Sequence, residues 1–269
     1  MYHELYKKIS ESVGLLTVFL DGEKISQGSC FCFLDTGEVI TAAHVITGRN
    51  PIKQEDVQDP SVQYFIKFPN VPLLEYTVSF CAITVHVDSF KEPIQIDMAV
   101  LQPKRNYEVE YPVLPINVNP PRLGDQVFLA GYSDELKLPF LIDRIIYKDH
   151  QGVDDFLQAM AKGYAADMTG PMIKRAYVGN HVVAGANKSH EDFSLTCDIL
   201  YLDNGMHSGA SGGPVVNESG VAVGIITQRA ITSASQYDAP SLDVPSGSTI
   251  AISFQSLLAL NTFPTQNNS

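Results

Sequence analysis

Cysteine is scarce in this sequence, with four residues in a chain of 269, and their positions do not form a disulfide framework. Cys30 and Cys32 are two residues apart in an expected strand, so their side chains point to the same face. Cys81 and Cys197 are isolated, and neither the spacing nor a nearby histidine supplies a set of zinc ligands. We therefore expect small buried residues within strands, and we expect no metal and no cofactor.

Long apolar runs and an excess of basic charge are also missing. No stretch approaches the roughly 20 apolar residues that cross a membrane, and the first residues hold no apolar run like that of a secretory signal. The chain has 18 Lys and Arg against 30 Asp and Glu, a net charge of −12, whereas nucleic-acid binding needs clustered cations. We therefore expect a cytoplasmic protein with no membrane and no nucleic acid among its partners.

What the chain does contain is a series of short apolar or alternating runs rich in Val, Ile, Thr, Phe and Tyr, separated by turn residues. This pattern predicts an all-β fold made of antiparallel barrels or sandwiches. In the first half the expected strands are Val13–Leu20, Gly28–Leu34, Glu38–His44, Val62–Phe68, Tyr76–Val87 and Asp97–Gln102. In the second half they are Asp125–Tyr132, Leu141–Tyr147, Met172–Ala186, Ser194–Leu200, Gly213–Asn217, Val221–Arg229 and Ser248–Ser253.

A stretch rich in Pro and Asn divides the chain into two halves. We take residues 1–111 as the first domain and residues 112–121 as the linker. The second domain then covers residues 122–262, and residues 263–269 form a tail.

Two helices are expected in the second half. Helical spacing of apolar residues predicts one over Val153–Ala165, and a short one at Phe254–Leu260 closes the domain. The first lies within residues 133–171, a segment longer than a minimal barrel needs to join two strands. We expect this segment to be an insertion over the second domain that binds a regulatory partner.

A glycine-rich segment holds a candidate nucleophile. It runs Ser208-Gly209-Ala210-Ser211-Gly212-Gly213-Pro214 and precedes an apolar strand. Glycines on both sides of Ser211 let the backbone turn tightly, which would aim the N–H groups of Gly209 and Ser211 at one point, as an oxyanion hole requires. Plain turns between strands have the same composition, so the segment by itself leaves both interpretations open.

Two further segments hold a candidate base and a candidate carboxylate. The apolar run Val39–Val45 includes two alanines and then His44, and these small neighbours leave room for a substrate backbone. Asp97 opens the apolar strand Asp97–Gln102, where a carboxylate is costly to bury without a partner. Hydrolysis by serine needs an imidazole to activate the hydroxyl and a carboxylate to orient the imidazole. Taken singly, a structural histidine and a turn aspartate remain alternative interpretations.

Together, these segments resemble the motifs of trypsin-like serine proteases. The order His44, Asp97, Ser211 is that of the family, and the resemblance covers roughly Val13 to Leu260. It implies two six-stranded antiparallel barrels, the first carrying His44 and Asp97, the second carrying Ser211, with the site in the cleft between them. It also implies a serine endopeptidase that acts on protein or peptide substrates through an acyl-enzyme, with Gly209 and Ser211 as the oxyanion hole.

Within that family the sequence is most similar to the HtrA (Deg) and related bacterial-type peptidases. Gly28-Ser29-Cys30-Phe31 looks like their segment before the histidine strand. Gly224–Thr227 looks like the strand that pairs with the substrate backbone, and there we expect the Thr227 hydroxyl to support Asp97. HtrA proteins usually carry a PDZ domain, and the residues after the last expected strand are too few for one, so we expect a member without it.

Two departures from the digestive relatives bear on activation. Val45 stands where those relatives carry a cysteine, so that disulfide is absent. Ala210 stands where they carry the aspartate that pairs with a newly cut N-terminus. The resemblance therefore does not extend to activation by N-terminal insertion.

The pocket that selects the substrate is expected at five residues. Gly205 stands where Arg- and Lys-specific relatives place a carboxylate, so we expect a small or medium apolar residue before the cleaved bond. Gly247 and Thr249 are expected to line the far wall, and Thr227 and Arg229 belong to the substrate-pairing strand. Arg229 has two alternative interpretations, a group that recruits an acidic side chain and a solvated cation at a strand edge.

Two rival functions remain beside the general endopeptidase. One is a dedicated processing protease that cuts a single partner or itself, which the insertion at residues 133–171 favours. The other is a catalytically dormant two-barrel binding module, against which the complete set of His44, Asp97 and Ser211 argues.

Overall fold

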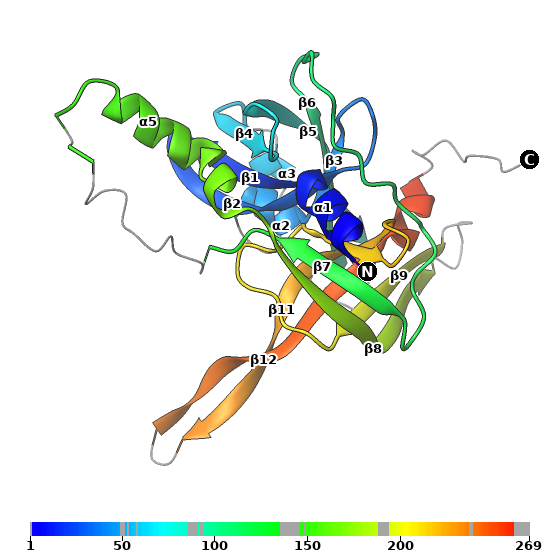
Figure 1. The fold of residues 1–269 in the computed structure, drawn as a ribbon. Helices are drawn as coiled ribbons and strands as arrows, with labels where there is room; N and C mark the ends of the chain where they lie inside the picture. Colours follow the sequence, from blue (N-terminus) through cyan, green and yellow to red (C-terminus); the bar gives the residue numbers. More distant parts are fainter. Residues whose placement is uncertain are drawn as a thin grey trace, which may run out of the picture.

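The computed structural model describes residues 2–48, 59–85, 94–134, 149–187, 194–236 and 239–260, with the short pieces 52, 54–57, 91 and 146–147. Its strands form two closed six-stranded barrels with antiparallel neighbours, which confirms the expected all-β architecture (Figure 1). Within these described ranges, no helix has the length and apolar character needed to cross a bilayer.

The first barrel has the strand order β1-β2-β3-β6-β5-β4. Its first strand is buried on both faces, which explains the unbroken apolar run in the sequence. Leu16 and Val18 point into the core of this barrel, whereas Val13 and Leu15 point the other way into a core layer shared with the second barrel. The strands are β1 (Val13–Leu20), β2 (Glu23–Cys32), β3 (Val39–Thr41), β4 (Val62–Lys67), β5 (Leu74–Val85) and β6 (Ile94–Pro103), with the short helices α2 (Ala43–Thr47) and α3 (Gln54–Val57) beside them.

The second barrel has the order β10-β11-β12-β9-β8-β7. The same alternation operates in β7, where Val127 and Leu129 face the core of this barrel while Phe128 and Ala130 face the layer shared with the first. The strands are β7 (Gln126–Gly131), β8 (Met172–Asn187), β9 (Ser194–Leu202), β10 (Pro214–Asn217), β11 (Ala222–Gln236) and β12 (Ala239–Ser253). The expected strand Leu141–Tyr147 falls largely outside the described residues.

Strands β11 and β12 continue well beyond the barrel as a two-stranded arm that projects from the body (Figure 1). The sequence predicted strands that end at Arg229 and begin again at Ser248, so the arm was missed. The arm side chains that the structure describes are largely exposed, including Ile231 and Leu242. A ribbon with little burial on either face has no alternation of apolar and polar residues to reveal it.

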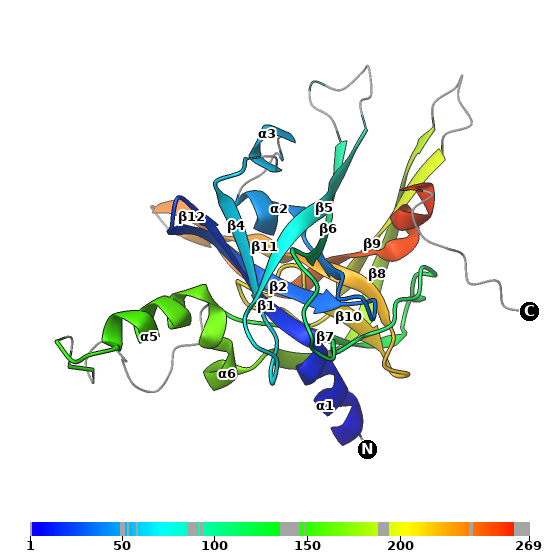
Figure 2. The same ribbon diagram turned by 90° about the horizontal axis from the view of Figure 1, so that it is seen from above.

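A helix lies at each end of the described chain. The helix α1 (His3–Ser12), which the sequence did not predict, lies beside β7 (Figure 2). It buries Ile9 and places Tyr6 edge-on against Phe128 of β7. The predicted closing helix has the expected bounds, but it is the 3₁₀-helix η2 (Phe254–Leu260). Phe254 packs against Phe31, so this helix also closes the layer between the barrels.

The described part of the insertion docks on the first barrel, not over the second as expected. It forms α5 (Val153–Ala159), the π-helical turn η1 (Met160–Tyr164) and α6 (Ala166–Thr169) (Figure 2). Lys67 at the end of β4 anchors it, with Nζ 2.7 Å from an Asp167 carboxylate oxygen and 5.3 Å from the ring centre of Tyr164. The hydroxyl of Thr17 in β1 also donates to the carbonyl of Lys162. An exposed apolar helix pattern carries no information about which barrel receives it.

Candidate active site

His44 lies in the first turn of α2, three residues after Thr41 at the end of β3, whereas the sequence placed it at the end of a strand. The carboxylate of Asp97 holds it at two points. Oδ1 accepts a hydrogen bond from the backbone N–H of His44 at 2.8 Å, and Oδ2 lies 2.7 Å from the ring nitrogen Nδ1. Because a carboxylate only accepts, Nδ1 is the donor and carries the proton. The other ring nitrogen, Nε2, is then left as the basic atom.

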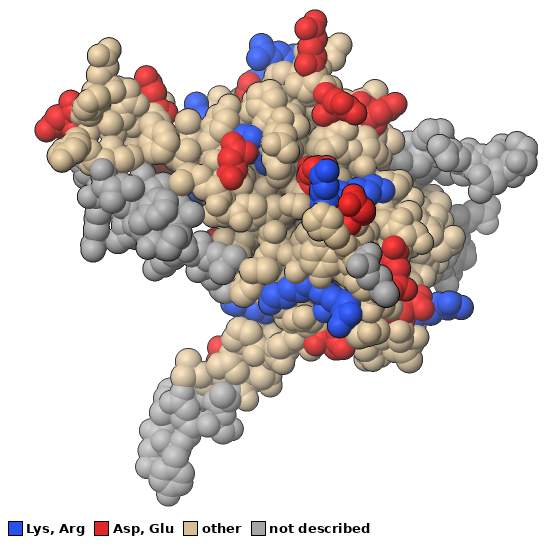
Figure 3. Space-filling model, in the orientation of Figure 1, with Lys and Arg blue, Asp and Glu red and all other residues tan. Residues whose placement is uncertain are grey.

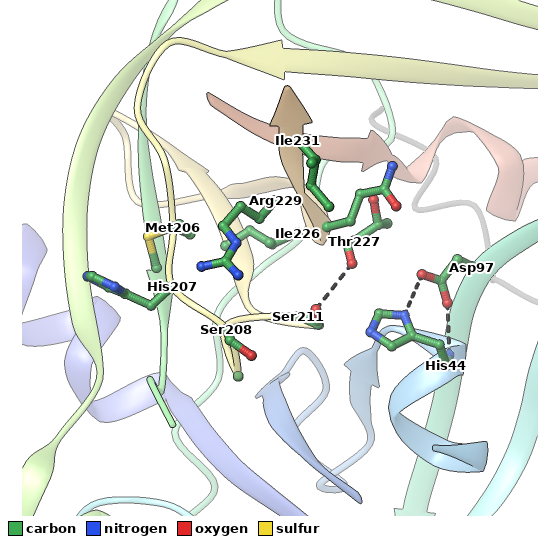
Figure 4. A pocket seen from close by; sticks show the side chains of 12 residues that line it. His44, Asp97, Met206, His207, Ser208, Ser211, Ile226, Thr227, Arg229 and Ile231 are labelled. Carbon is green, nitrogen blue, oxygen red and sulfur yellow. Dashed lines mark hydrogen bonds and ion pairs between the residues drawn. The ribbon is translucent and has the colours of Figure 1, made fainter. Parts of the chain in front are cut away.

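The position of Asp97 follows from the alternation of β6. Its neighbours Ile96 and Met98 point into the layer between the barrels, so the carboxylate points to the opposite face of the strand. There its side chain is 23% exposed and that of His44 is 26% exposed. Figure 4 shows the imidazole between the Asp97 carboxylate and Ser211.

Ser211 follows a tight turn that is tied to both barrels. The turn runs from His207 to Ala210, whose N–H donates to the His207 carbonyl at 3.3 Å, and Gly209 has a φ of +87° within it. The carbonyl of Ser208 accepts from the N–H of Asp134 at 3.1 Å. The carbonyl of Gly209 accepts from the Ser29 hydroxyl at 2.9 Å. Both carbonyls are thus held, and among the described residues no acceptor takes the N–H of Gly209 or Ser211.

The two glycines after Ser211 are required by close approach. A Cβ at Gly212, where φ is +84°, would meet the carbonyl of Ser29 and the hydroxyl of Thr41 from the first barrel. A Cβ at Gly213 would meet the carbonyl of Ala130 in β7. The nucleophile loop therefore sits where the backbones of both barrels come together.

The Ser211 hydroxyl makes its hydrogen bond to the carbonyl of Thr227 at 3.1 Å. It must turn away from that carbonyl to reach His44. The expectation that the Thr227 hydroxyl supports Asp97 is wrong for this structure, because that hydroxyl donates to the carbonyl of Ile250 at 3.2 Å. A neighbouring strand competes for the hydroxyl, and the sequence does not reveal that competition.

A cavity of about 270 Å³ joins these groups. Of the residues predicted from the sequence, it brings together His44, Asp97, Gly209, Ser211, Thr227 and Arg229. The site residues predicted from the sequence did not include Met206, His207, Ser208, Ile226, Gln228 and Ile231. Met206 and His207 directly precede the glycine-rich segment, and Ser208 is its first residue.

Three residues predicted for the specificity pocket, Gly205, Gly247 and Thr249, do not line this cavity. Thr249 is fully buried, and its hydroxyl donates to the carbonyl of Asn204 at 2.7 Å and accepts from the N–H of Met206 at 2.8 Å. Gly205 lies against Gly247, since a Cβ built on Gly205 would be 3.0 Å from the Gly247 carbonyl carbon. These residues support the loop that forms the cavity wall.

Among the described residues, no side chains are arranged for catalysis by a bound metal ion or by a cysteine thiolate. No set of three or more His, Cys, Asp or Glu side chains is placed there to hold a metal ion. Burial raises the pKa of the Cys81 thiol to about 12, and the nearby charge of Asp97 adds to the rise. Cys81 is therefore a protonated thiol at neutral pH and lacks the thiolate that a cysteine nucleophile needs.

Comparison with solved structures supports the fold. The chain is similar to the crystal structure of the Rv3671c protease from M. tuberculosis in its active form, with 14% sequence identity, a TM-score of 0.53, and coverage of 96% of this chain and 82% of that one. The inactive form of Rv3671c also matches at 14% identity and a TM-score of 0.53, covering 96% of this chain and 91% of that chain. No curated protein matches the sequence.

The family comparison agrees with the motifs. The model of the trypsin-like peptidase domain matches residues 28–225, a span that holds His44, Asp97 and Ser211. This span is more than half of the chain, so the protein belongs to the family of trypsin-like peptidase domains and is a serine peptidase.

Proposed function

We propose that the protein is an endopeptidase that hydrolyses peptide bonds through an acyl-enzyme formed on Ser211. His44 is the general base, Asp97 orients it, and the N–H groups of Gly209 and Ser211 bind the oxyanion. The observation that carries the proposal is the pair of hydrogen bonds that the Asp97 carboxylate accepts from His44 beside Ser211, in one cavity with the turn at Gly209.

The reaction would begin with a rotation of the Ser211 side chain from the Thr227 carbonyl toward Nε2 of His44. As the hydroxyl oxygen attacks the substrate carbonyl, its proton passes to Nε2, and the charge of the imidazolium is balanced by Asp97. The negative oxygen of the tetrahedral intermediate is stabilised by the two backbone N–H groups. The imidazolium then protonates the leaving amine, and a water molecule activated by the same base hydrolyses the acyl-enzyme.

Active-site labelling tests this proposal. A fluorophosphonate probe should label the wild-type protein once per chain, and Ser211→Ala should abolish the labelling because the acceptor oxygen is gone. Ser61→Ala provides a matched control, since Ser61 lies outside the cavity and its hydroxyl donates to the Asp59 carboxylate. Labelling that survives in Ser211→Ala, or is absent from the wild type, would contradict the proposal, and absence would favour the dormant binding module.

A dedicated processing protease is a second candidate, and one contact favours it. Asp134, at the start of the insertion, binds the nucleophile loop twice, through its N–H to the Ser208 carbonyl and through its carboxylate, which accepts from the Ser208 hydroxyl at 2.9 Å. A regulatory partner that binds the insertion could act on the oxyanion turn through this contact. Proteomic cleavage profiling separates the candidates, because a processing protease yields one dominant substrate and a general endopeptidase yields many.

A further inference from the structure

Strand β11 continues from the active-site cavity into the arm without a break. Arg229 and Ile231 of β11 both line the cavity, where Figure 4 shows them with Ser211, and the strand runs on to Gln236. The register with β12 shifts between Arg229 and Ile231. Their partners on β12 are Thr249 and Pro245, so the extra residues of this irregularity lie on β12 and β11 itself continues. The arm therefore carries one strand of the site away from the cavity.

One edge of β11 is unpaired along the arm. On one side β12 pairs with β11 as far as Gln236. On the other side β10 pairs with it only as far as Ile225, and the loop after Ser211 bonds to Ile226. In the part of the chain that the structure describes, no strand pairs with this second edge from Ile231 onward. The edge can therefore accept a further strand.

The two edges of the arm differ in the residues that protect them. In the arm, β12 carries Pro240, Asp243 and Pro245. Proline has no N–H to donate and a charged residue resists a neighbouring strand, and both are used in natural proteins to protect the edges of sheets. The arm residues of β11, from Ala230 to Gln236, include no proline and no charged residue. The edge that continues from the cavity is therefore the one left open to an incoming chain.

The direction of pairing decides which part of a substrate lies on this edge. β11 passes Ser211, whose hydroxyl donates to the Thr227 carbonyl, and then runs away from it toward Gln236. Both β10 and β12 are antiparallel to β11. An added strand of the same sense runs opposite to β11, so it begins on the arm and reaches Ser211 farther along its own chain. The residues before the cleaved bond would therefore lie on the arm.

We propose that the edge of β11 from Ile231 to Gln236 binds the substrate as an added antiparallel strand. With the residue before the cleaved bond at Thr227, this edge lies opposite the fifth to tenth residues before the bond. It lengthens the binding edge by roughly 17 Å, since each residue of a strand spans about 3.3 Å. The inference rests on the proposed endopeptidase function and identifies its substrates as extended polypeptide segments that have a long stretch before the bond. Backbone hydrogen bonds make the contact, so many side chains are tolerated there.

A pair of peptides tests the position and direction of this binding. Mass spectrometry first identifies a bond that the protein cuts in a denatured protein, and peptides around that bond are made with four or with ten residues before it. We expect kcat/KM of the longer peptide to be higher by on the order of tenfold, mainly through a lower KM, because backbone hydrogen bonds are added. A peptide extended by six residues after the bond is the matched control and should gain little. An equal gain from that control would contradict the pairing.

Methylation of the peptide backbone tests how the contact is made. In an antiparallel pair, alternate residues of a strand turn their N–H groups toward the same neighbour. Methylating one amide at a time, from the fifth to the eighth residue before the bond, should lower kcat/KM at every second position by on the order of fivefold. The positions between should change little. A uniform loss, or no loss, would contradict strand pairing.

A shortened arm identifies the part of the protein responsible. Replacing residues 233–243 by Asn-Gly joins Thr232 to Val244, which pair in the arm, through a two-residue hairpin turn. This variant should cut the two peptides with nearly equal kcat/KM, and cleavage of the shorter peptide reports that the cavity is intact. The matched control replaces residues 186–195 by Asn-Gly, which joins Gly185 to Thr196 of the pair β8 and β9. It should keep the full advantage of the longer peptide.

The outcomes separate the two proposals. If the fluorophosphonate labels the wild-type protein but both peptides are cut equally or not at all, or if the shortened arm keeps the advantage of length, substrate binding by the arm is wrong and the labelled serine stands. Binding of substrate is also wrong if the wild-type protein sediments as a dimer and the shortened arm makes it a monomer, because a second copy then occupies the edge. If neither the fluorophosphonate nor any peptide reacts, the proposed function fails and binding by the arm fails with it.

Discussion

Single side chains decide how the reactive loop is held, and Ser29 is the clearest case. Its hydroxyl donates to the Gly209 carbonyl at 2.9 Å and accepts from the Tyr132 N–H at 2.8 Å, so it links β2, the end of β7 and the oxyanion turn. Ala210 replaces the aspartate that stabilises this turn in digestive relatives. A serine on the first barrel supplies part of that support here.

Replacing Ser29 by alanine should therefore impair catalysis more than binding. Without the hydroxyl, the Gly209 carbonyl loses its donor and the turn can reorient, which removes an oxyanion donor. We expect kcat to fall by roughly 10²-fold with little change in KM. Steady-state kinetics on a peptide ester measure this split, and Ser26→Ala on the same strand is the control. An unchanged kcat, or a change confined to KM, would rule out a positioning role for Ser29.

The buried thiols make a prediction about alkaline stability. Burial raises the pKa of both Cys32 and Cys81 to about 12, from 9.0 for an unperturbed thiol. Between those values the unfolded chain releases thiol protons that the native protein keeps, so stability falls as pH rises. The stabilising contribution is complete below about pH 9 and is lost toward pH 12. Melting temperatures from pH 8 to 11 should fall less steeply in Cys81→Ala than in the wild type, and equal slopes would contradict the assignment.

At the scale of elements, polar contacts join the described part of the insertion to the first barrel, and Lys67 is central to them. Its side chain is 3% exposed, and Nζ donates to the carbonyls of Phe68 and Val71 at 2.8 and 2.6 Å in addition to the Asp167 pair. A buried ammonium is stable only with such partners. The contact connects β4 of the first barrel to α6 and η1.

Lys67→Met should loosen the insertion while both barrels stay folded. The two carbonyls lose their donor, which costs about 1–3 kcal/mol, and Asp167, which is 43% exposed, can return to water. Limited proteolysis with mass spectrometry should detect faster cleavage within residues 149–170. Lys104→Met is the control, because Lys104 is 57% exposed in its pair with Glu75 and its loss should have little effect. Cleavage rates equal to the wild type would show that Lys67 is not the anchor.

At the scale of the whole molecule, the shared core layer holds the two barrels in the arrangement that the site needs. Phe31 and Ile40 from the first barrel and Phe128 and Ile225 from the second belong to one buried cluster. His44 and Asp97 come from one barrel and Ser211 from the other, so this cluster fixes their relative positions. The molecule carries a net charge of −12, yet a band of basic side chains crosses the second barrel on the face seen in Figure 3.

Strongly buried strands were predictable from the sequence, and weakly buried elements were not. Val13–Leu20 was predicted with the bounds that β1 has, because its apolar run is continuous and ends at Asp21-Gly22. The described side chains of the arm of β11 and β12 are largely exposed, and α1 mixes charged and apolar residues over its 10 residues. The place of such elements depends on segments far away in the chain, and no local pattern reveals it.

The same division holds for the site. The sequence by itself determined the residue types and their order, because Gly212 and Gly213 can only be glycine where two backbones meet and Ser211 stands between glycine-bearing turns. Only the tertiary structure decided which groups share a cavity. It buried Thr249 under the loop, gave the Thr227 hydroxyl to Ile250, and aimed Arg229 into the space beside Ser211. Hydrogen bonds and charges act over a few ångströms in space, and distance along the chain does not measure that separation.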